Sequence, residues 1–125
     1  MLKRRILIVA SDHDTRKALR LAFQHADFAV SAAASEKTAL GSLTSPAPDI
    51  IVTDLLMPLV RGEDFIRFLK TQPQLSATPI VVLTAHLHAF GQAARAAGAA
   101  ETLDKSSDLS AVVATVKRLL GDSDD

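Results

Sequence analysis

Short, uninterrupted apolar runs recur along this chain, separated by segments with helical periodicity. Three of them contain no polar residue: ILIV (6–9), IIV (50–52) and IVVL (80–83). Such runs are typical of strands that are buried on both faces of a parallel sheet. Two weaker segments, FAVSAAA (28–34) and AAETLD (99–104), indicate strands at the sheet edges. The sequence therefore predicts five strands, of which three are central.

Apolar residues spaced three or four positions apart predict the helices that alternate with these strands. The spacing is clearest in two series, the first at Leu19, Ala22, Phe23 and Ala26, and the second at Leu109, Val112, Val113, Val116 and Leu120. Both series indicate helices with one apolar face.

Residues with capping preferences mark several helix ends. Ser35 is the expected N-cap of the second helix, and Ser107 or Asp108 that of the last. Gly62 is expected to open the third helix, and Gly98 lies where the fourth should stop.

Strands that alternate with helices through short loops form right-handed crossovers and a doubly wound α/β sheet. The order 2-1-3-4-5 places the three most apolar strands inside and the two weaker ones at the edges. We therefore predict a flavodoxin-like (βα)5 fold with a five-stranded parallel sheet. In this order the ligand crevice lies at the carboxyl ends of the first and third strands.

The length and composition limit the remaining alternatives. With 125 residues the chain is the size of one domain, expected over residues 1–121, with a short acidic tail over 122–125. The 14 basic and 14 acidic residues balance, so charge gives no indication of a nucleic-acid or membrane partner. The absence of cysteine excludes disulfides and thiolate metal sites. No apolar stretch approaches the roughly 20 residues of a membrane span, so we expect a soluble, cytoplasmic protein.

Polar residues follow three of the predicted strands where each strand ends. Asp54 comes just after the third strand, Thr84 ends the fourth and Lys105 follows the fifth. A carboxylate held at a strand end can attack phosphorus, a hydroxyl can donate to a phosphoryl oxygen, and an ammonium can pair with either group. Taken singly, each has a simpler interpretation: a turn aspartate, a threonine with β propensity and a solvated lysine.

The order and surroundings of these residues resemble the response-regulator receiver domain of two-component signalling. The resemblance rests on PDIIVTDLLMPLVRG (48–62), LTAH (83–86) and LDKS (103–106) and extends over residues 6–120. It implies that Asp54 accepts a phosphoryl group from a histidine kinase or a phosphotransfer protein. Thr84 and Lys105 would respond to it and repack the surface formed by the fourth helix, fifth strand and fifth helix. That surface would bind a downstream partner or a second copy of the chain.

The family also holds a magnesium ion, and here the chain departs from the family pattern. The resemblance assigns Asp54 and the backbone carbonyl of Leu56 as metal ligands, together with a pair of acids after the first strand. This chain has Ala10-Ser11 at that place. Because Mg²⁺ prefers hard oxygen ligands such as carboxylates, only Ser11 and Asp12 remain as substitutes. Asp12 has an alternative role as a helix cap. We therefore expect Mg²⁺ binding to be weak or lost.

Two further departures concern the fifth strand and its loop. Thr102 replaces the usual tyrosine or phenylalanine, and Ser106 replaces the proline that commonly follows the lysine. Without that proline a cis peptide bond costs roughly 3 kcal/mol, so the loop that presents Lys105 is expected to differ in shape. Asp54 and Lys105 could form a compensated ion pair with no metal at all.

Two functions follow from these residues. The first is a working phosphoacceptor receiver with weakened magnesium dependence. The alternative is a degenerate receiver that acts as a phosphorylation-independent interaction module. An independent enzyme is the least favoured reading, because the segment ASDHDTR (10–16) contains no glycine for a flavin-phosphate loop. The Asp12-His-Asp14 triplet also lacks the sequence context of an aspartate-nucleophile phosphatase.

Overall fold

The computed structural model describes residues 3–41, 47–54, 62–85 and 87–121, and the structural statements below concern these residues. Its strands are β1 (Arg5–Val9), β2 (Ala29–Ala33), β3 (Ile50–Asp54), β4 (Ile80–Thr84) and β5 (Glu101–Asp104). Its helices are α1 (His13–His25), α2 (Glu36–Gly41), α3 (Gly62–Thr71), α4 (Leu87–Ala97) and α5 (Leu109–Leu119), with a short 3₁₀ turn at Pro73–Leu75.

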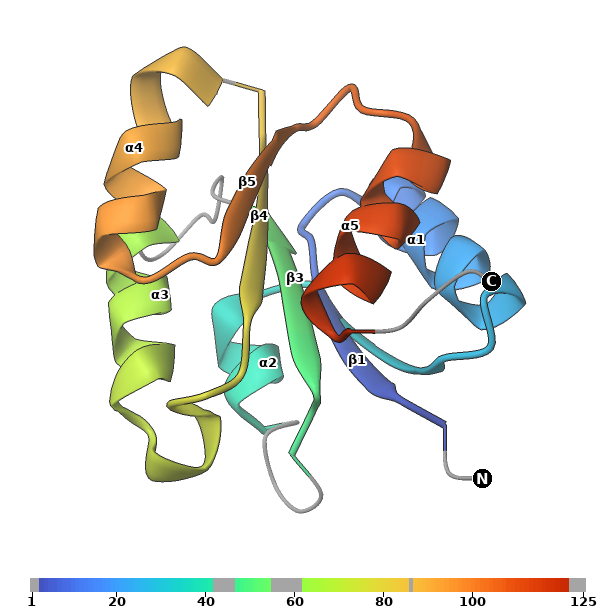
Figure 1. The fold of residues 1–125 in the computed structure, drawn as a ribbon, viewed down its shortest axis with the longest axis horizontal. Helices are drawn as coiled ribbons and strands as arrows, with labels where there is room; N and C mark the ends of the chain where they lie inside the picture. Colours follow the sequence, from blue (N-terminus) through green and yellow to red (C-terminus); the bar gives the residue numbers. More distant parts are fainter. Residues whose placement is uncertain (1–2, 42–46, 55–61, 86, 122–125) are drawn as a thin grey trace.

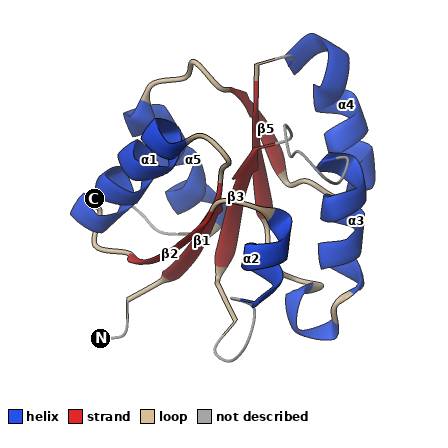
Figure 2. Ribbon diagram, turned by 180° about the vertical axis from the view of Figure 1, so that it is seen from behind, coloured by secondary structure: helices blue, strands red, loops and turns tan. Residues whose placement is uncertain are grey.

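The five strands form one parallel sheet in the order β2-β1-β3-β4-β5. Helices α1 and α5 cover one face, and α2, α3 and α4 cover the other (Figures 1 and 2). The predicted fold class and strand order are confirmed. The two strands predicted at the edges, β2 and β5, also lie there.

The apolar runs are continuous because each strand supplies side chains to two cores. In β1, Leu7 and Val9 belong to the core beneath α3 and α4, whereas Ile6 and Ile8 belong to the core beneath α1 and α5. All four are no more than 2% exposed. Burial of one such side chain contributes about 1.5–3 kcal/mol, so this alternation strongly fixes the register of the central strands.

The predicted helix ends agree with the structure. The Ser35 hydroxyl accepts a hydrogen bond from the Thr38 N–H, and Asp108, rather than Ser107, is the N-cap of α5. Gly98 follows α4 with a φ of 121°, a value that L side chains rarely adopt. Gly62 is the first residue of α3.

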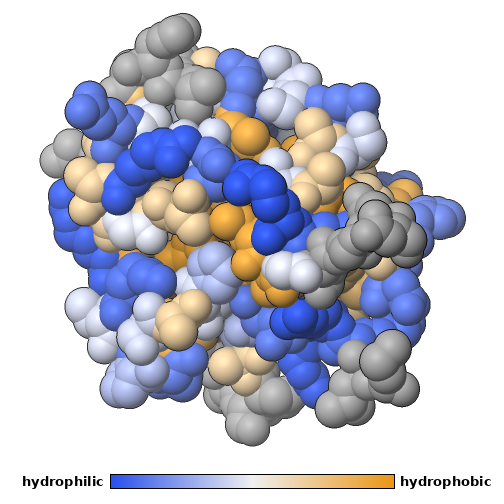
Figure 3. Space-filling view, in the orientation of Figure 1, coloured by the Kyte–Doolittle hydropathy of each residue, from blue (hydrophilic) through white to orange (hydrophobic). Residues whose placement is uncertain are grey.

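The outer surface is mixed in character. Figure 3 shows hydrophilic residues over much of one face, with smaller hydrophobic areas between them. Among the described helices, none has the length and apolar character needed to cross a bilayer. The expected cytoplasmic location stays a prediction.

Candidate functional site

Three of the predicted site residues lie at the same edge of the sheet. In the strand register Asp54 pairs with Leu83, and Thr84 pairs with Asp104. The Lys105 N–H then donates to the Thr84 carbonyl at 2.9 Å, which extends the β4–β5 pairing by one residue. Asp54, Thr84 and Lys105 are thus assembled by neighbouring strand ends, as the sequence predicts.

Asp54 and Lys105 form a direct ion pair. The Lys105 Nζ lies 2.8 Å from Asp54 Oδ2, which is the usual length of a charge-assisted hydrogen bond. The Asp54 side chain is only 3% exposed, whereas that of Lys105 is 26% exposed. The carboxylate is therefore held away from bulk water with an ammonium group as its counter-charge, and the ammonium keeps a path to solvent.

Thr84 is buried at the end of β4, with 1% of its surface exposed. Its backbone carbonyl binds the Lys105 N–H, so Thr84 anchors the start of the loop that carries the lysine. Leu56, the predicted backbone metal ligand, lies outside the described residues, as do Met57 and Pro58.

The first residue after β1 is Ala10, which has no side-chain oxygen. Ala10 is 1% exposed and lines a narrow hollow together with Asp54, Lys105 and apolar residues of β1, α1, β3 and β4. The hollow is too narrow for a water molecule. Thr15 and Thr53 also line the hollow, and among its described lining residues Asp54 is the only carboxylate.

Asp12 acts as the N-cap of α1. Its Oδ2 accepts hydrogen bonds from the Thr15 hydroxyl at 2.6 Å and from the Thr15 N–H at 2.8 Å. These two bonds, in that order, lower the pKa of the Asp12 carboxyl, and the positive charge of Lys105 adds to the effect. The structure thus gives Asp12 the capping role that the sequence offered as its alternative.

The donors available for a cation are few in the described part of the chain. No group of three or more histidine, aspartate or glutamate side chains is placed there to hold a metal ion. The Asp54 carboxylate contacts Lys105, and one oxygen of Asp12 is engaged by Thr15. Ser11 is exposed, next to the cap. The expected weakening of Mg²⁺ binding stays a prediction.

Comparison with known proteins decides the family. The sequence model described as "Response regulator receiver domain" matches residues 6–117. This chain belongs to the response-regulator receiver family. It is a signalling module of two-component signal transduction rather than a catalytic enzyme, and receiver domains of this kind work with histidine kinases.

Relatives and solved receivers agree with this assignment. The chain is 32% identical over 117 residues to the response regulator MprA of Mycolicibacterium vanbaalenii, covering 93% of this chain and 50% of that protein. It is 33% identical over 117 residues to the transcriptional regulatory protein PrrA of Mycobacterium tuberculosis, covering 93% of this chain and 49% of PrrA. The chain therefore spans about half the length of these two relatives.

Among solved structures, the chemotaxis response regulator CheY4 of Vibrio cholerae superimposes with a TM-score of 0.88 at 27% identity. The match covers 94% of this chain and 99% of CheY4. The receiver domain of the sensor histidine kinase PA1611 from Pseudomonas aeruginosa, solved with a magnesium ion in its active-site cleft, has a TM-score of 0.86 at 21% identity. That match covers 96% of this chain and 99% of PA1611's receiver, and at this identity it shows the fold alone.

Two residues of this receiver's site were missed by the sequence reasoning. Arg16, on α1, donates to the carbonyl of Ala10 at 2.8 Å and secures the end of β1. Asp104 accepts two hydrogen bonds from Ser106 in the loop that carries Lys105. The spacing of Asp104 and Ser106 is that of an Asx-turn, which was the available signal.

At the start of β5, the end away from Lys105, Glu101 connects two helices. Its carboxylate binds Arg95 of α4 and, at 3.1 Å, Arg118 of α5, and it also accepts the Thr102 N–H at 3.2 Å. Burial opposes ionisation of Glu101, but the Thr102 N–H and the Arg118 and Arg95 guanidinium groups outweigh it and lower the pKa of the carboxyl. The α4-β5-α5 face of this receiver is thus joined by one carboxylate.

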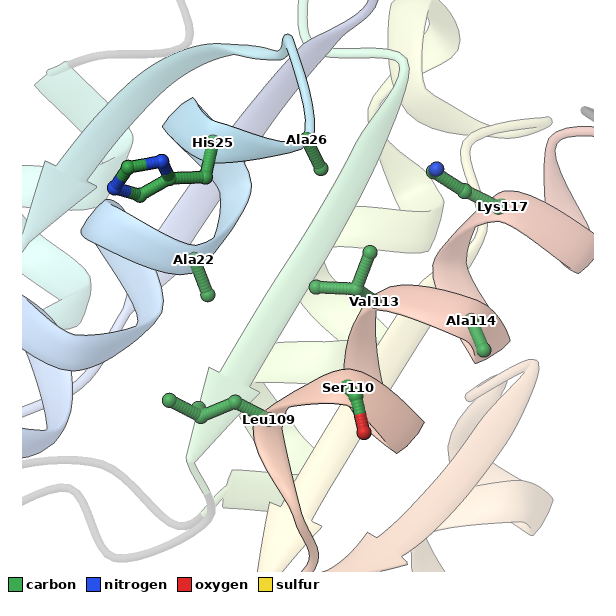
Figure 4. A pocket seen from close by; sticks show the side chains of 8 residues that line it. All are labelled: Ala22, His25, Ala26, Leu109, Ser110, Val113, Ala114 and Lys117. Atoms are coloured by element: carbon green, nitrogen blue, oxygen red, sulfur yellow. The ribbon is translucent and has the colours of Figure 1, made fainter. Parts of the chain in front are cut away.

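A separate open groove lies between α1 and α5 (Figure 4). Ala22, Leu109 and Val113 supply apolar surface, and His25 and Lys117 also line it. The residues that line the groove do not include Asp54, Thr84 or Lys105, so it is not part of the phosphoacceptor site.

Proposed function

We propose that this receiver accepts a phosphoryl group on Asp54 from a histidine kinase or a phosphotransfer protein. A carboxylate oxygen of Asp54 attacks the phosphorus, a new O–P bond forms and the bond to the donor breaks with its electron pair. The observation that carries the proposal is the buried Asp54, held at the strand-end crevice with Lys105 at 2.8 Å. Lys105 then transfers its contact from the carboxylate to a phosphoryl oxygen.

Magnesium is proposed to contribute little to this site. Ala10 stands where receivers resembling this one carry an acid, and its buried methyl group supplies no ligand. Ser11 and Asp12 are poor substitutes, because a serine hydroxyl is neutral and the Asp12 carboxylate caps α1. Phosphoryl transfer uses Mg²⁺ to neutralise developing charge, so phosphorylation here should be slow and weakly dependent on the ion.

The output surface is proposed to be the α4-β5-α5 face. Thr84 lies at the site, and its backbone carbonyl binds the Lys105 N–H. Strand β5 leads to Lys105 and begins at Glu101, which joins α4 and α5. A change at Lys105 therefore reaches this face through a single strand. A downstream protein or a second copy of the chain would bind there.

We also propose that the receiver domain comprises residues 1–121 and that residues 122–125 form a short acidic tail.

A second function, a phosphorylation-independent interaction module, is favoured by one specific observation. Asp54 already has a counter-charge in Lys105, and Ala10 removes one neighbouring carboxylate. The unphosphorylated site is thus balanced and needs no ligand to hold one conformation.

Intact mass spectrometry separates the two functions. The chain is incubated with acetyl phosphate, with and without Mg²⁺, beside Asp54→Asn and an ordinary receiver as a positive control. Phosphorylation predicts the gain of one phosphoryl group that is absent in Asp54→Asn and removed by hydroxylamine, as for an acyl phosphate. No gain with acetyl phosphate or with a panel of phosphorylated histidine donors, while the control receiver is modified, would reject phosphorylation and support the interaction module.

The same assay tests the metal proposal. The double variant Ala10→Asp/Ser11→Asp restores two carboxylates at the end of β1 and should make phosphorylation faster and strongly dependent on Mg²⁺. An equally strong Mg²⁺ dependence in the unmodified chain would contradict the proposal that the ion contributes little.

A further inference from the structure

The loop that carries Lys105 is closed by the residues on either side of it. Asp104 Oδ1 accepts hydrogen bonds from the Ser106 N–H at 2.8 Å and from the Ser106 hydroxyl at 2.6 Å. The Ser107 N–H donates to the Asp104 carbonyl at 2.9 Å. These bonds define a β-turn over residues 104–107 with an Asx-turn inside it, and aspartate is favoured at the first position of such a turn.

This turn begins at a fixed point of the sheet. Asp104 pairs with Thr84 in the β4–β5 register, and the Lys105 N–H binds the Thr84 carbonyl. The backbone of Lys105 is therefore held before it by the sheet and after it by the turn. The lysine side chain extends from this held backbone and reaches Asp54 Oδ2.

Ser106 supplies two donors to Asp104 Oδ1, and it departs from the proline pattern noted above. Proline at position 106 has no N–H and no hydroxyl, so it could not bind the Asp104 carboxylate. The turn here is therefore closed by hydrogen bonds that depend on a residue other than proline. Asp104 and Ser106 act as a unit.

We propose that Asp104 and Ser106 are positioning residues that direct Lys105 onto Asp54. The lysine side chain is flexible and loses rotamer entropy when it is held in one place, and a fixed backbone direction limits the region that its ammonium explores. A loosened turn would let Nζ spend more time in solvent, which Lys105 already partly contacts. The coupling between Lys105 and Asp54 would then weaken, although neither residue had been changed.

A set of double-mutant cycles measures this coupling directly. Asp54→Asn, Lys105→Met and their combination are made in the wild-type chain and in the Asp104→Ala and Asp104→Asn backgrounds. Urea unfolding at neutral pH gives the unfolding equilibrium constant of each protein. If the two residues did not interact, the effects of the two single changes on the unfolding equilibrium constant would multiply in the double variant. The factor by which the double variant departs from that product is the coupling.

The expected coupling is about tenfold in the wild-type chain, within the range for residues in direct contact. It should fall below about threefold with Asp104→Ala. With Asp104→Asn it should return to near the wild-type value, because the amide oxygen has two lone pairs and still accepts both the Ser106 N–H and the Ser106 hydroxyl. An unchanged coupling in Asp104→Ala would overturn the proposal even if that variant is less stable, since a purely structural turn lowers stability without changing the coupling.

If Asp104→Ala does not fold, Ser106→Ala gives the decision. It removes the hydroxyl donor at 2.6 Å and leaves the backbone N–H in place. A reduced coupling supports the positioning role, and an unchanged coupling rejects it. No phosphodonor enters any of these cycles, so their outcome and the outcome of the phosphorylation assay are independent.

Discussion

Substitution of Asp54 by asparagine separates two pictures of the resting site. If clustered carboxylates repel one another, removal of one charge stabilises the fold. If Asp54 and Lys105 are a compensated pair, the same change destabilises it. The structure favours the second picture, because Ala10 carries no charge and the Asp12 carboxylate is held at the N-terminus of α1.

The size of the effect follows from the burial of the two partners. Removal of one partner of a fully buried ion pair costs about 3–5 kcal/mol, and a hydrogen bond to a charged group contributes about 1.5–3 kcal/mol. Lys105 is 26% exposed and can turn toward water after Asp54 is neutralised. We therefore expect Asp54→Asn to lower the free energy of unfolding by about 1–2 kcal/mol, which is roughly 4–8 °C in melting temperature for a chain of this size.

Lys105→Met provides the matched comparison. It keeps most of the side-chain volume but removes the ammonium group that lies 2.8 Å from the Asp54 carboxylate, which is 3% exposed. That carboxylate has no path to water comparable with that of Lys105, so this variant should lose more stability, about 2–4 kcal/mol. The order of the two losses is thus fixed by the unequal burial of the pair.

Urea denaturation near neutral pH and low salt, followed by circular dichroism, gives both values, and a thermal scan checks their order. A higher melting temperature for Asp54→Asn would refute the reasoning, because carboxylate repulsion would then dominate the resting site. A smaller loss for Lys105→Met than for Asp54→Asn would contradict the burial argument.

Two further predictions concern the start of β5 and the turn before it, at the other end of this strand from Lys105. Glu101→Gln should lower the free energy of unfolding at about pH 7 by about 0.5–1 kcal/mol. Folding lowers the pKa of Glu101 from 4.5, so the extra stability of the wild-type chain over Glu101→Gln should be complete above that pH. It should disappear as the pH falls through the folded pKa. Urea midpoints of both proteins across this pH range measure the difference. Gly98→Ala should cost about 1–3 kcal/mol, because φ is 121° and the new Cβ would lie 2.9 Å from Lys70 Cγ. Gly41→Ala, at a helical position with no atom within 4 Å of its Cβ, is the control and should not destabilise in the same urea assay.

The sequence was sufficient for the fold because one physical cause acts on every central strand. Each of the runs 6–9, 50–52 and 80–83 must be covered on both faces, and only a parallel sheet between two helical layers does this with short connections. The relative positions of Asp54, Thr84 and Lys105 follow directly, since the carboxyl ends of parallel strands share an edge.

Side-chain contacts were harder to predict from the sequence, because they depend on three-dimensional geometry that residue spacing does not encode. Glu101 joins Arg95 and Arg118 only because α4 and α5 lie on opposite faces beside the same edge strand. Arg16 reaches the Ala10 carbonyl because α1 turns back over the end of β1. Asp12 was different: its position before the first helix already indicated a cap, and the structure adds Thr15 as its partner.

The ion pair also bears on how a receiver with few acids could still react. If the Asp54–Lys105 contact were opened and not replaced, the lost free energy would add to the activation barrier. Each added 1.4 kcal/mol, approximately, lowers the rate about tenfold. Lys105 need not lose its partner, because the incoming phosphoryl oxygens offer the same negative charge at the same strand edge. The contact is then transferred rather than broken, and the lysine supplies part of the charge neutralisation that a metal ion would otherwise provide. On this reasoning Ala10 and Ser11 should affect the proposed phosphorylation rate more than the stability of the unphosphorylated fold.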